Sequence, residues 1–432
     1  MMRPFRDLPE GPIRLTNLTV PACLLGRPGG LARIDLSIAE GRIAPAGGAE
    51  VDMAGAMAFP AFVDMHTHLD KGHIWGRAPN PDGTFPNALE TVRADTEANW
   101  SADDVARRAD FALRCAWAHG TRAIRTHLDS RPPQDAISWP VFRELREAWR
   151  GRIALQGVCL IGVDSFSEDG PFARTADLVA ESGGVLGMVA YPIEGLRDRL
   201  RAFFRMAEAR GLSADFHVDE TMDPSSETLR AIAETVLETG FAAPVVVGHC
   251  CSLSAQDEAR AMDTLDLVAR AGLHVVSLPM CNLYLQDRHA GRTPRNRGIT
   301  LVHEMRARGI PVSFASDNTR DPFYAYGDMD MLEVMREATR IGHLDHSRED
   351  WPEAFLTAPA AACGFDAPAL APGAPADLVL CRAREWTELF SRPQADRIVL
   401  RAGRAIDRTL PDYAELDDLM TKTQTPVREP AQ

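Results

Sequence analysis

Apolar runs of strand length alternate with helix-like stretches through most of the chain. In the helix-like stretches, apolar positions recur at helical spacing and a glycine usually follows the last turn, as is common just beyond a helix C-terminus. Helices are predicted over 101–120, 139–150, 196–210, 226–239, 254–271 and 301–308. Eight strands that alternate with helices predict an α/β protein, a (β/α)8 TIM barrel over residues 57–364. The strand-like runs start near Met57, Thr121, Ile153, Val185, Ser213, Pro244, His274 and Val312.

Both ends of the chain have a different pattern, in which apolar and polar residues alternate in short strand-like segments separated by turns. Residues 1–56 contain strand-like segments around 13–20 and 34–43, and residues 365–420 contain two more, at 376–380 and 397–401. Period-two alternation between glycine-containing turns predicts a half-buried sheet. We expect the two ends to build one small β unit, with a Pro/Gly-rich loop (77–86) at the barrel mouth and a polar, frayed tail at 421–432.

Composition narrows the class of protein. The chain has 432 residues, enough for one large barrel plus a minor domain, and a net charge of −14 from 47 basic and 61 acidic residues. This charge disfavours nucleic acid and anionic membranes as partners, and leaves a homo-oligomer open. No apolar window reaches the length of a membrane span, and residues 1–10 do not resemble a secretory signal. Eight scattered cysteines without a CxxC pair predict reduced thiols and a cytoplasmic location.

The stretch Ala61-Phe62-Val63-Asp64-Met65-His66-Thr67-His68-Leu69-Asp70 is the first with candidate chemistry. It begins as a strand and ends in two histidines at i and i+2, which alternation places on the same side. Two neighbouring imidazoles are half of a site for zinc or iron(II). An HxH pair alone is also compatible with two ordinary polar residues after a strand.

Other predicted strands also end in ionisable residues, and barrel active sites lie at those strand ends. His217 is the natural third nitrogen ligand and Asp317 an oxygen ligand, which leaves one position of a single ion open for water. Such an ion makes hydroxide available near neutral pH. Glu220 is placed to shuttle a proton, and His249 to hold the hydroxide or support the ligands.

Each of these residues also has a plainer interpretation. His249 can be a structural strand-end histidine and Glu220 a solvated loop charge. His127, in Arg125-Thr126-His127-Leu128-Asp129, either supports the ligands or only the barrel mouth. Lys71 is interpreted as a loop residue. Cys250 and Cys251, which follow His249, are predicted to be buried, unreactive thiols.

Several further motifs extend the picture over nearly the whole chain. They are Pro60-Ala61-Phe62-Val63-Asp64 before the histidine pair, His217-Val218-Asp219-Glu220, Gly248-His249, Asn282-Leu283-Tyr284-Leu285-Gln286-Asp287-Arg288, Arg297-Gly298-Ile299-Thr300 and Ser316-Asp317-Asn318-Thr319-Arg320-Asp321-Pro322. With these motifs the chain resembles the amidohydrolase superfamily, and within it the cytosine deaminase-like branch. The resemblance implies a barrel with a small β-sandwich built from both termini, and one divalent ion, Zn or Fe(II).

The resemblance also implies roles for individual residues. The metal ligands match His66, His68, His217 and Asp317, the catalytic glutamate matches Glu220, and the histidine that assists the water matches His249. Asp317 is expected to act in catalysis as well as in metal binding. All six positions are occupied by the residue type that the family uses.

The chain departs from cytosine deaminase where the pyrimidine is bound. Gly162 stands where that family has a glutamine, Asn318 where it has an aspartate, and Phe323 where it has a tryptophan. Loss of a bidentate amide partner removes hydrogen bonds that select one heterocycle. We therefore expect Gly162, Asn318, Phe323 and Trp75 to contact a substrate other than plain cytosine, with Asp164 as a further candidate.

The function predicted from the sequence is hydrolytic deamination of a small nitrogen heterocycle by a metal-dependent enzyme that acts on carbon–nitrogen bonds other than peptide bonds. An alternative is cleavage of a cyclic amide or an N-alkylamino substituent on the same scaffold. Retention of Glu220 favours deamination, because protonation of the ring needs such a residue. A binding protein without activity is the third interpretation, and the complete set of six residues argues against it.

Overall fold

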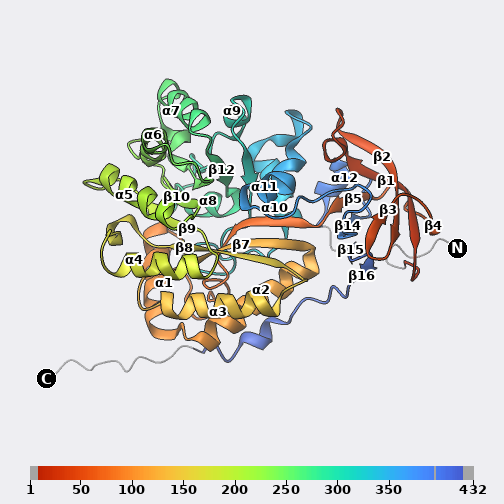
Figure 1. The fold of residues 1–432 in the computed structure, drawn as a ribbon, viewed down its shortest axis with the longest axis horizontal. Coiled ribbons are helices and arrows are strands. Elements are labelled where there is room, and N and C mark those ends of the chain that lie inside the picture. Colours follow the sequence, from red (N-terminus) through yellow and green to blue (C-terminus); the bar gives the residue numbers. More distant parts are fainter. Residues whose placement is uncertain (1–7, 394–395, 422–432) are drawn as a thin grey trace.

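Eight parallel strands alternate with helices along the middle of the chain and form a barrel (Figure 1). The computed structural model describes residues 8–393 and 396–421. Seven of the predicted strand starts agree with the structure to within one residue, whereas the run that starts at Met57 is divided into two strands. The barrel strands are β6 (Phe62–Thr67), β7 (Thr121–Asp129), β8 (Ala154–Leu160), β9 (Leu186–Ala190), β10 (Ala214–Val218), β11 (Val245–His249), β12 (His274–Ser277) and β13 (Val312–Phe314).

Isolated bridges complete the barrel between its two hydrogen-bonded sheets, β6–β8 and β9–β13. Val158 pairs with Val185 and Gly162 with Val189, which joins β8 to β9. Thr67 pairs with Asp317, which joins β6 to the end of β13. Since the strands are parallel, all their C-terminal ends lie at one face, where barrel active sites are built.

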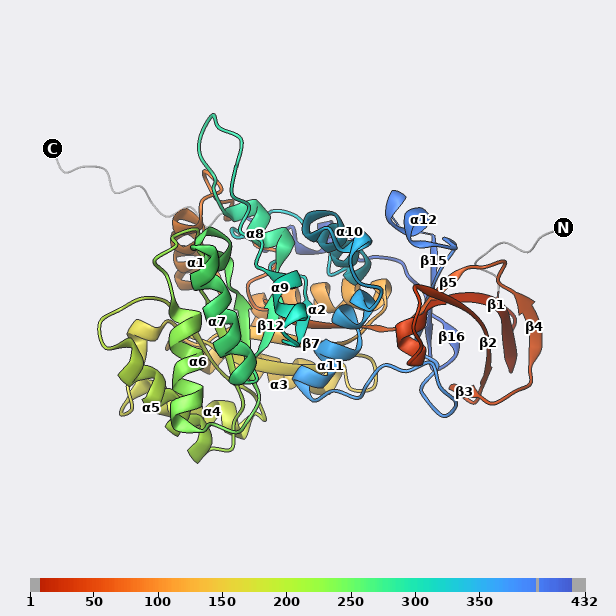
Figure 2. The same cartoon turned by 90° about the horizontal axis from the view of Figure 1, so that it is seen from above.

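The helices lie around the strands (Figure 2). Ser101 caps its helix by accepting a hydrogen bond from Asp104 N, and Gly120 ends that helix with φ 98°, as the sequence predicts. Helices α1, α4, α8, α10, α11 and α12 are not predicted by the pattern. The helices are α1 (Phe85–Asn99), α2 (Ala102–His119), α3 (Asp135–Ala148), α4 (Pro171–Glu181), α5 (Leu196–Ala209), α6 (Thr228–Thr239), α7 (Glu258–Arg270), α8 (Pro279–Leu285), α9 (Val302–Ala307), α10 (Met331–Gly342), α11 (Thr357–Cys363) and α12 (Trp386–Ser391).

Both ends of the chain contribute to one small β domain beside the barrel, as predicted. Its strands form a single hydrogen-bonded sheet in the order β16-β15-β14-β5-β1-β2-β3, with β4 also paired to β1. A register shift in β1 between Leu15 and Leu18 lets β4 and β5 pair with successive parts of it. The strands are β1 (Ile13–Pro21), β2 (Leu31–Ala39), β3 (Arg42–Ala44), β4 (Ala49–Asp52), β5 (Met57–Pro60), β14 (Leu378–Cys381), β15 (Arg397–Arg401) and β16 (Arg404–Ala405).

The strands β5, β14 and β15 belong to two hydrophobic cores at once. In β14, Leu378 and Leu380 pack in the core of the small domain, whereas Val379 and Cys381 pack in the core of the barrel. Alternation along a strand sends successive side chains to opposite faces, so one sheet can serve both cores. Because of this shared sheet, the barrel and the small domain have a continuous apolar interface.

The segment that follows β16 crosses back to the barrel, although the sequence assigns residues up to 420 to the small domain. Figure 1 shows it running beneath α2 toward the C-terminus. Arg107 pairs with Asp418 at 2.7 Å, and Arg77 Nη1 donates to the oxygen of Leu419 at 3.1 Å. The predicted frayed tail from 422 onward lies outside the described residues.

None of the helices in the described part of the chain combines the length and apolar character that crossing a membrane requires.

Candidate metal centre and active site

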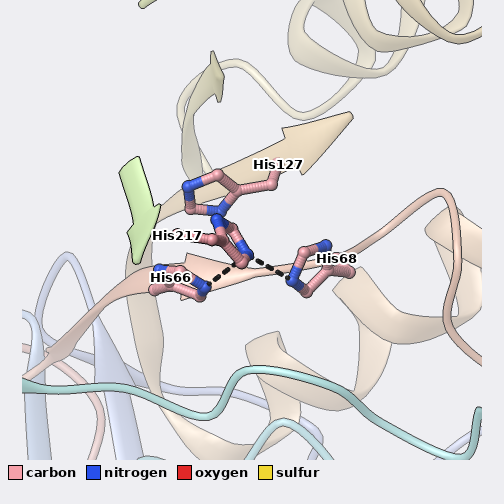
Figure 3. A group of neighbouring side chains, drawn as sticks. All are labelled: His66, His68, His127 and His217. Atoms are coloured by element: carbon pink, nitrogen blue, oxygen red, sulfur yellow. Dashed lines mark hydrogen bonds between the residues drawn. The ribbon is translucent and has the colours of Figure 1, made fainter. Parts of the chain in front are cut away.

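The histidine pair at the end of β6 meets side chains from β10 and β13. His66 and His68 point to one side of the strand, and His217 from β10 lies between them (Figure 3). The Nε2 atom of His217 is 3.1 Å from Nε2 of His66 and 3.3 Å from Nε2 of His68. Asp317 places Oδ1 at 3.6 Å from the first of these nitrogens and 3.3 Å from the second. The structure thus gathers the four predicted ligands.

The spacing of these four atoms fits one metal ion. Ligand atoms that are about 2.0 to 2.1 Å from an ion at tetrahedral angles are about 3.3 Å from one another. The four separations given above, out of the six among these atoms, are 3.1 to 3.6 Å and lie around that value. All four side chains are buried, as ligands of an enclosed ion would be.

The proposed ligands are in the chemical state that metal binding requires. Among the described residues, the carboxylate of Asp317 accepts no hydrogen bond from an N–H or O–H group, and besides the histidine nitrogens its polar neighbour is the weak thiol donor of Cys281. A buried carboxylate without donors is costly, and a cation would satisfy it. Burial, followed by neighbouring positive groups, keeps the pKa values of His66, His68 and His217 well below 6.5. Neutral imidazoles are the form that binds a metal.

Several of these side chains stand on backbone in the left-handed region. Asp317 has φ 63°, His249 φ 69° and Asp219 φ 50°. This conformation costs energy for a non-glycine residue and persists where surrounding bonds enforce it. Here Asp317 N donates to His66 O at 2.9 Å, and Cys251 N donates to Asp219 O at 2.9 Å. The carboxylate of Asp219 in turn accepts from the N–H groups of Thr228 and Leu229 at the start of α6.

Glu220 and His249 share one partner, Asn282 of α8. Asn282 Nδ2 donates to Glu220 Oε1 at 3.3 Å and to His249 Nδ1 at 3.0 Å. Because the amide nitrogen only donates, Nδ1 of a neutral His249 accepts and its ring proton lies on Nε2. Burial first, and Asp317 second, raises the pKa of Glu220 well above 4.5. Burial also raises the thiol pKa values of Cys250 and Cys251, as expected for unreactive thiols.

A buried ionic network lies against the histidines. His127 Nε2 is 3.1 Å from Asp215 Oδ1, and Arg125 Nη1 is 2.9 Å from Asp215 Oδ2. The ring centroid of His127 is 4.0 Å from that of His66. The four histidines of Figure 3 form one group of close ligand atoms, and His66, His249 and Asp317 form another. Sequence reasoning missed Asp215, although its position two residues before His217 on β10 places it on the same strand face.

Gly162 lies at the end of β8, beside two polar side chains. A Cβ atom at this position would be 2.5 Å from Asp164 Oδ1 and 3.2 Å from Tyr191 Oη. The carboxylate of Asp164 therefore takes the space that a side chain at residue 162 would fill. Burial, followed by the hydrogen bond that the Tyr191 hydroxyl donates to Asp164, raises the pKa of Tyr191 to about 12.

The other residues expected to contact substrate lie in loops after β6 and β13. Asn318 is engaged at both ends of its amide, donating to Asp321 Oδ2 at 2.7 Å and accepting from Cys281 Sγ at 3.4 Å. Phe323 is 8% exposed and packs edge-on against Phe85. Trp75 is half-buried, and its main-chain N–H donates to the main-chain oxygen of Arg320.

Comparison with known proteins gives one family and several relatives. The model of the "Amidohydrolase family" matches residues 160–406. A pterin deaminase of Rhizobium rhizogenes is 54% identical over 420 residues, which cover 94% of this chain and 96% of that protein.

Solved structures of similar fold cover nearly the whole chain. The 5-methylcytosine deaminase of Klebsiella pneumoniae, liganded with 5-fluorocytosine, has a TM-score of 0.77 and 24% identity, with coverage of 92% of this chain and 98% of that one. The N-isopropylammelide isopropylaminohydrolase of Burkholderia multivorans has a TM-score of 0.70 and 27% identity, with coverage of 91% and 98%.

Proposed function

The chain belongs to the amidohydrolase family, and from that premise we propose that it deaminates a pterin-type ring, a 2-amino-4-oxopteridine. The predicted class, a hydrolase that acts on carbon–nitrogen bonds of a small heterocycle, is confirmed by the family match and by the deaminase relatives. The observation that favours the pteridine ring is the 54% identity to a pterin deaminase over almost the full length of both chains.

The donor set at the centre suits a divalent ion of borderline softness. His66, His68, His217 and Asp317 offer three neutral imidazoles and a carboxylate, which zinc and iron(II) both accept. Bound there, such an ion supplies Lewis acidity, making water more acidic and stabilising the negative charge that develops on oxygen. We propose Zn or Fe(II) as the single ion.

Glu220 is the proposed proton donor to the ring. Its raised pKa favours the protonated form, which can transfer a proton to the ring nitrogen next to the aminated carbon. Asp317 accepts one proton of the attacking water and passes it to the amino group. The C–N bond breaks with its electrons on nitrogen, ammonia leaves, and the remaining hydroxyl proton returns to Glu220, so that a carbonyl is left.

His249 orients the water in this scheme. Asn282 holds its Nδ1 atom, and Nε2 has no hydrogen-bond partner among the described residues. The Nε2–H group is therefore available to donate to the oxygen that attacks. Burial, and the neighbouring His127, lower the pKa of His249 to about 3, which keeps the ring neutral.

The residues around Gly162 support a substrate other than cytosine. The glutamine expected for a cytosine deaminase is absent, and a carboxylate acceptor, Asp164, stands beside Tyr191 in its place. A site with a carboxylate in place of an amide favours a ring edge that presents N–H groups, because a carboxylate only accepts hydrogen bonds.

We propose that the protein is located in the cytoplasm, which the eight free cysteines support.

The decisive experiment is ammonia release from 2-amino-4-oxopteridine by the purified, metal-loaded protein, with mass spectrometry of the product in ¹⁸O-water. The expected product carries one ¹⁸O atom in place of the amino group. The matched comparison is the same pteridine with an isopropyl group on its 2-amino nitrogen, because one of the similar structures is an N-isopropylammelide isopropylaminohydrolase. Release of isopropylamine without ammonia release, or ring opening alone, would overturn the proposal.

A further inference from the structure

Lysine is nearly absent from this protein, and one of its two lysines is buried beside the candidate active site. Of the 47 basic residues, only Lys71 and Lys422 are lysines, and Lys422 lies outside the described residues. Arginine occupies the other basic positions. An ammonium is a compact charge with three N–H donors, whereas a guanidinium is a wide planar fork. A buried lysine, in a chain whose other basic residues are arginine except for Lys422, is compatible with a position that needs the smaller group.

The main chain around Lys71 is held firmly from the barrel side. Arg108 Nη1 donates to the carbonyl oxygens of Asp70 at 2.7 Å and of Gly72 at 2.8 Å, the two residues that flank Lys71. Gly72 N also donates to His68 O at 3.0 Å. Lys71 is thus fixed three residues beyond a candidate metal ligand, and it is only 5% exposed.

The ammonium group of Lys71 lies between a carboxylate and an aromatic ring. Its Nζ atom is 3.4 Å from Asp129 Oδ1 at the end of β7 and 5.1 Å from the ring centroid of Phe323. Phe323 is one of the residues that the sequence predicts to contact substrate. The ammonium group therefore lies between the carboxylate of Asp129 and the place where we expect the substrate ring.

The charges around Lys71 keep it an ammonium and connect it with the catalytic groups. Burial alone would lower its pKa, but Asp129, Asp70 and Asp321 together raise it. Its positive charge in turn acts on Glu220 and Asp317, where it offsets part of the rise in pKa that burial causes. Among the described residues, Asp129 is the one ion-pair partner of Nζ, which leaves N–H groups for another acceptor.

We propose that Lys71 selects the substrate by donating a hydrogen bond to the oxo oxygen of the ring, while the ring lies near Phe323. This inference rests on the proposed deaminase function and adds the residue that recognises the 4-oxo group. When water attacks the aminated carbon, electron density moves into the ring nitrogens and onward to the conjugated carbonyl. A cation at that oxygen binds the substrate and also stabilises the transition state.

The test compares two rings that differ only in the recognised group, 2-amino-4-oxopteridine and 2-aminopteridine, in a Lys422→Arg parent and its Lys71→Met derivative. Loss of a charged hydrogen bond lowers kcat/KM for the oxo ring by about 10- to 100-fold, with little change for the ring that lacks it. Metal content is measured in both proteins. An equal loss on both rings would assign Lys71 a structural role and overturn the inference.

A second measurement keeps Lys71 in place, in case the methionine variant does not fold. In the Lys422→Arg protein labelled with ε-¹³C-lysine, Lys71 is the single labelled side chain. Its signal is expected to shift on addition of 2,4-dioxopteridine and to stay unchanged with 2-aminopteridine. An unchanged signal with both rings would contradict the proposed contact. If the parent releases no ammonia from either ring, the deaminase function fails, and the ¹³C signal still decides whether Lys71 binds an oxo group.

Discussion

Arg108 Nη1 donates a hydrogen bond of 2.7 Å to the main-chain oxygen of Asp70, and this bond joins helix α2 to the loop that follows the histidine pair. Arg108 is fully buried and its charge is balanced by Asp104, which also pairs with Arg77. A residue of the barrel's outer layer thus holds the backbone next to the candidate metal centre.

Replacement of Arg108 by methionine is expected to lower the free energy of unfolding by about 3 to 5 kcal/mol, since it leaves Asp104 buried with one partner fewer. Denaturant unfolding of the two proteins measures the difference. Arg107→Met is the matched control, because Arg107 is one-third exposed and pairs with Asp418 at the surface, a contact worth less than about 1 kcal/mol. Equal effects of the two substitutions would contradict the structural role of Arg108.

His217→Ala and Asp317→Asn each remove a proposed ligand, and both are expected to reduce the bound metal and to lower kcat more than about 100-fold. Elemental analysis of purified protein gives the metal content, and the ammonia assay gives the rate. His289→Ala serves as the control, because His289 is exposed and lies in the loop after α8. Variants with full metal content and full turnover would exclude the proposed centre.

Glu220→Gln is expected to keep the metal while lowering kcat about 100- to 10,000-fold, because the amide cannot transfer a proton. In the wild type, only the protonated carboxyl group is active as donor, so the rate should fall as pH rises through its raised pKa. Glu227→Gln is the control, since Glu227 pairs with Arg260 on the helix side. A pH profile that keeps its alkaline limb in Glu220→Gln would assign that limb to another group.

Asp330 gives a prediction for stability in acid. Burial alone would raise its pKa, but Arg397 and His119 hold it well below 3.8, and Arg397 Nη1 donates to Asp330 Oδ1 at 2.8 Å. A carboxylate with a lowered pKa stabilises the fold above its unfolded pKa, and that contribution is lost as pH falls below about 4. Asp330→Asn should therefore be less stable than wild type at pH 7, and the gap should narrow toward pH 3. A gap that is constant with pH, measured on metal-free proteins, would contradict this assignment.

Local sequence signals were sufficient for most of the barrel. The strand starts follow from runs of apolar residues, and Gly120 and Gly240 end their helices in the left-handed conformation that glycine favours. The division of the run from Met57 was missed, because residues 57–60 pair with β14, more than 300 residues away. Pairing with so distant a strand cannot be recognised from the neighbouring residues in the sequence. Helix α1 was missed because few of its positions are buried, so its apolar stripe is narrow.

The candidate site was predictable to the extent that it uses strand alternation. His66 and His68 share a side for that reason, and the position of each strand end located His217 and Asp317. The network of Asp215, His127 and Arg125 was not predicted, since a charged residue inside a strand has no sign of its partner. Nor did the sequence indicate that Lys71 is buried, because two of the acids that surround it, Asp129 and Asp321, are far from it along the chain.

The sheet shared by β5, β14 and β15 has a consequence for how the protein is made. Synthesis proceeds from the N-terminus, so all eight barrel strands leave the ribosome before residues 378–401, which supply Val379 and Val399 to the barrel core. Until those residues emerge, the nascent barrel has an uncovered apolar wall. The last strands are thus a closing step of folding, and a chain truncated before them would expose that wall to aggregation.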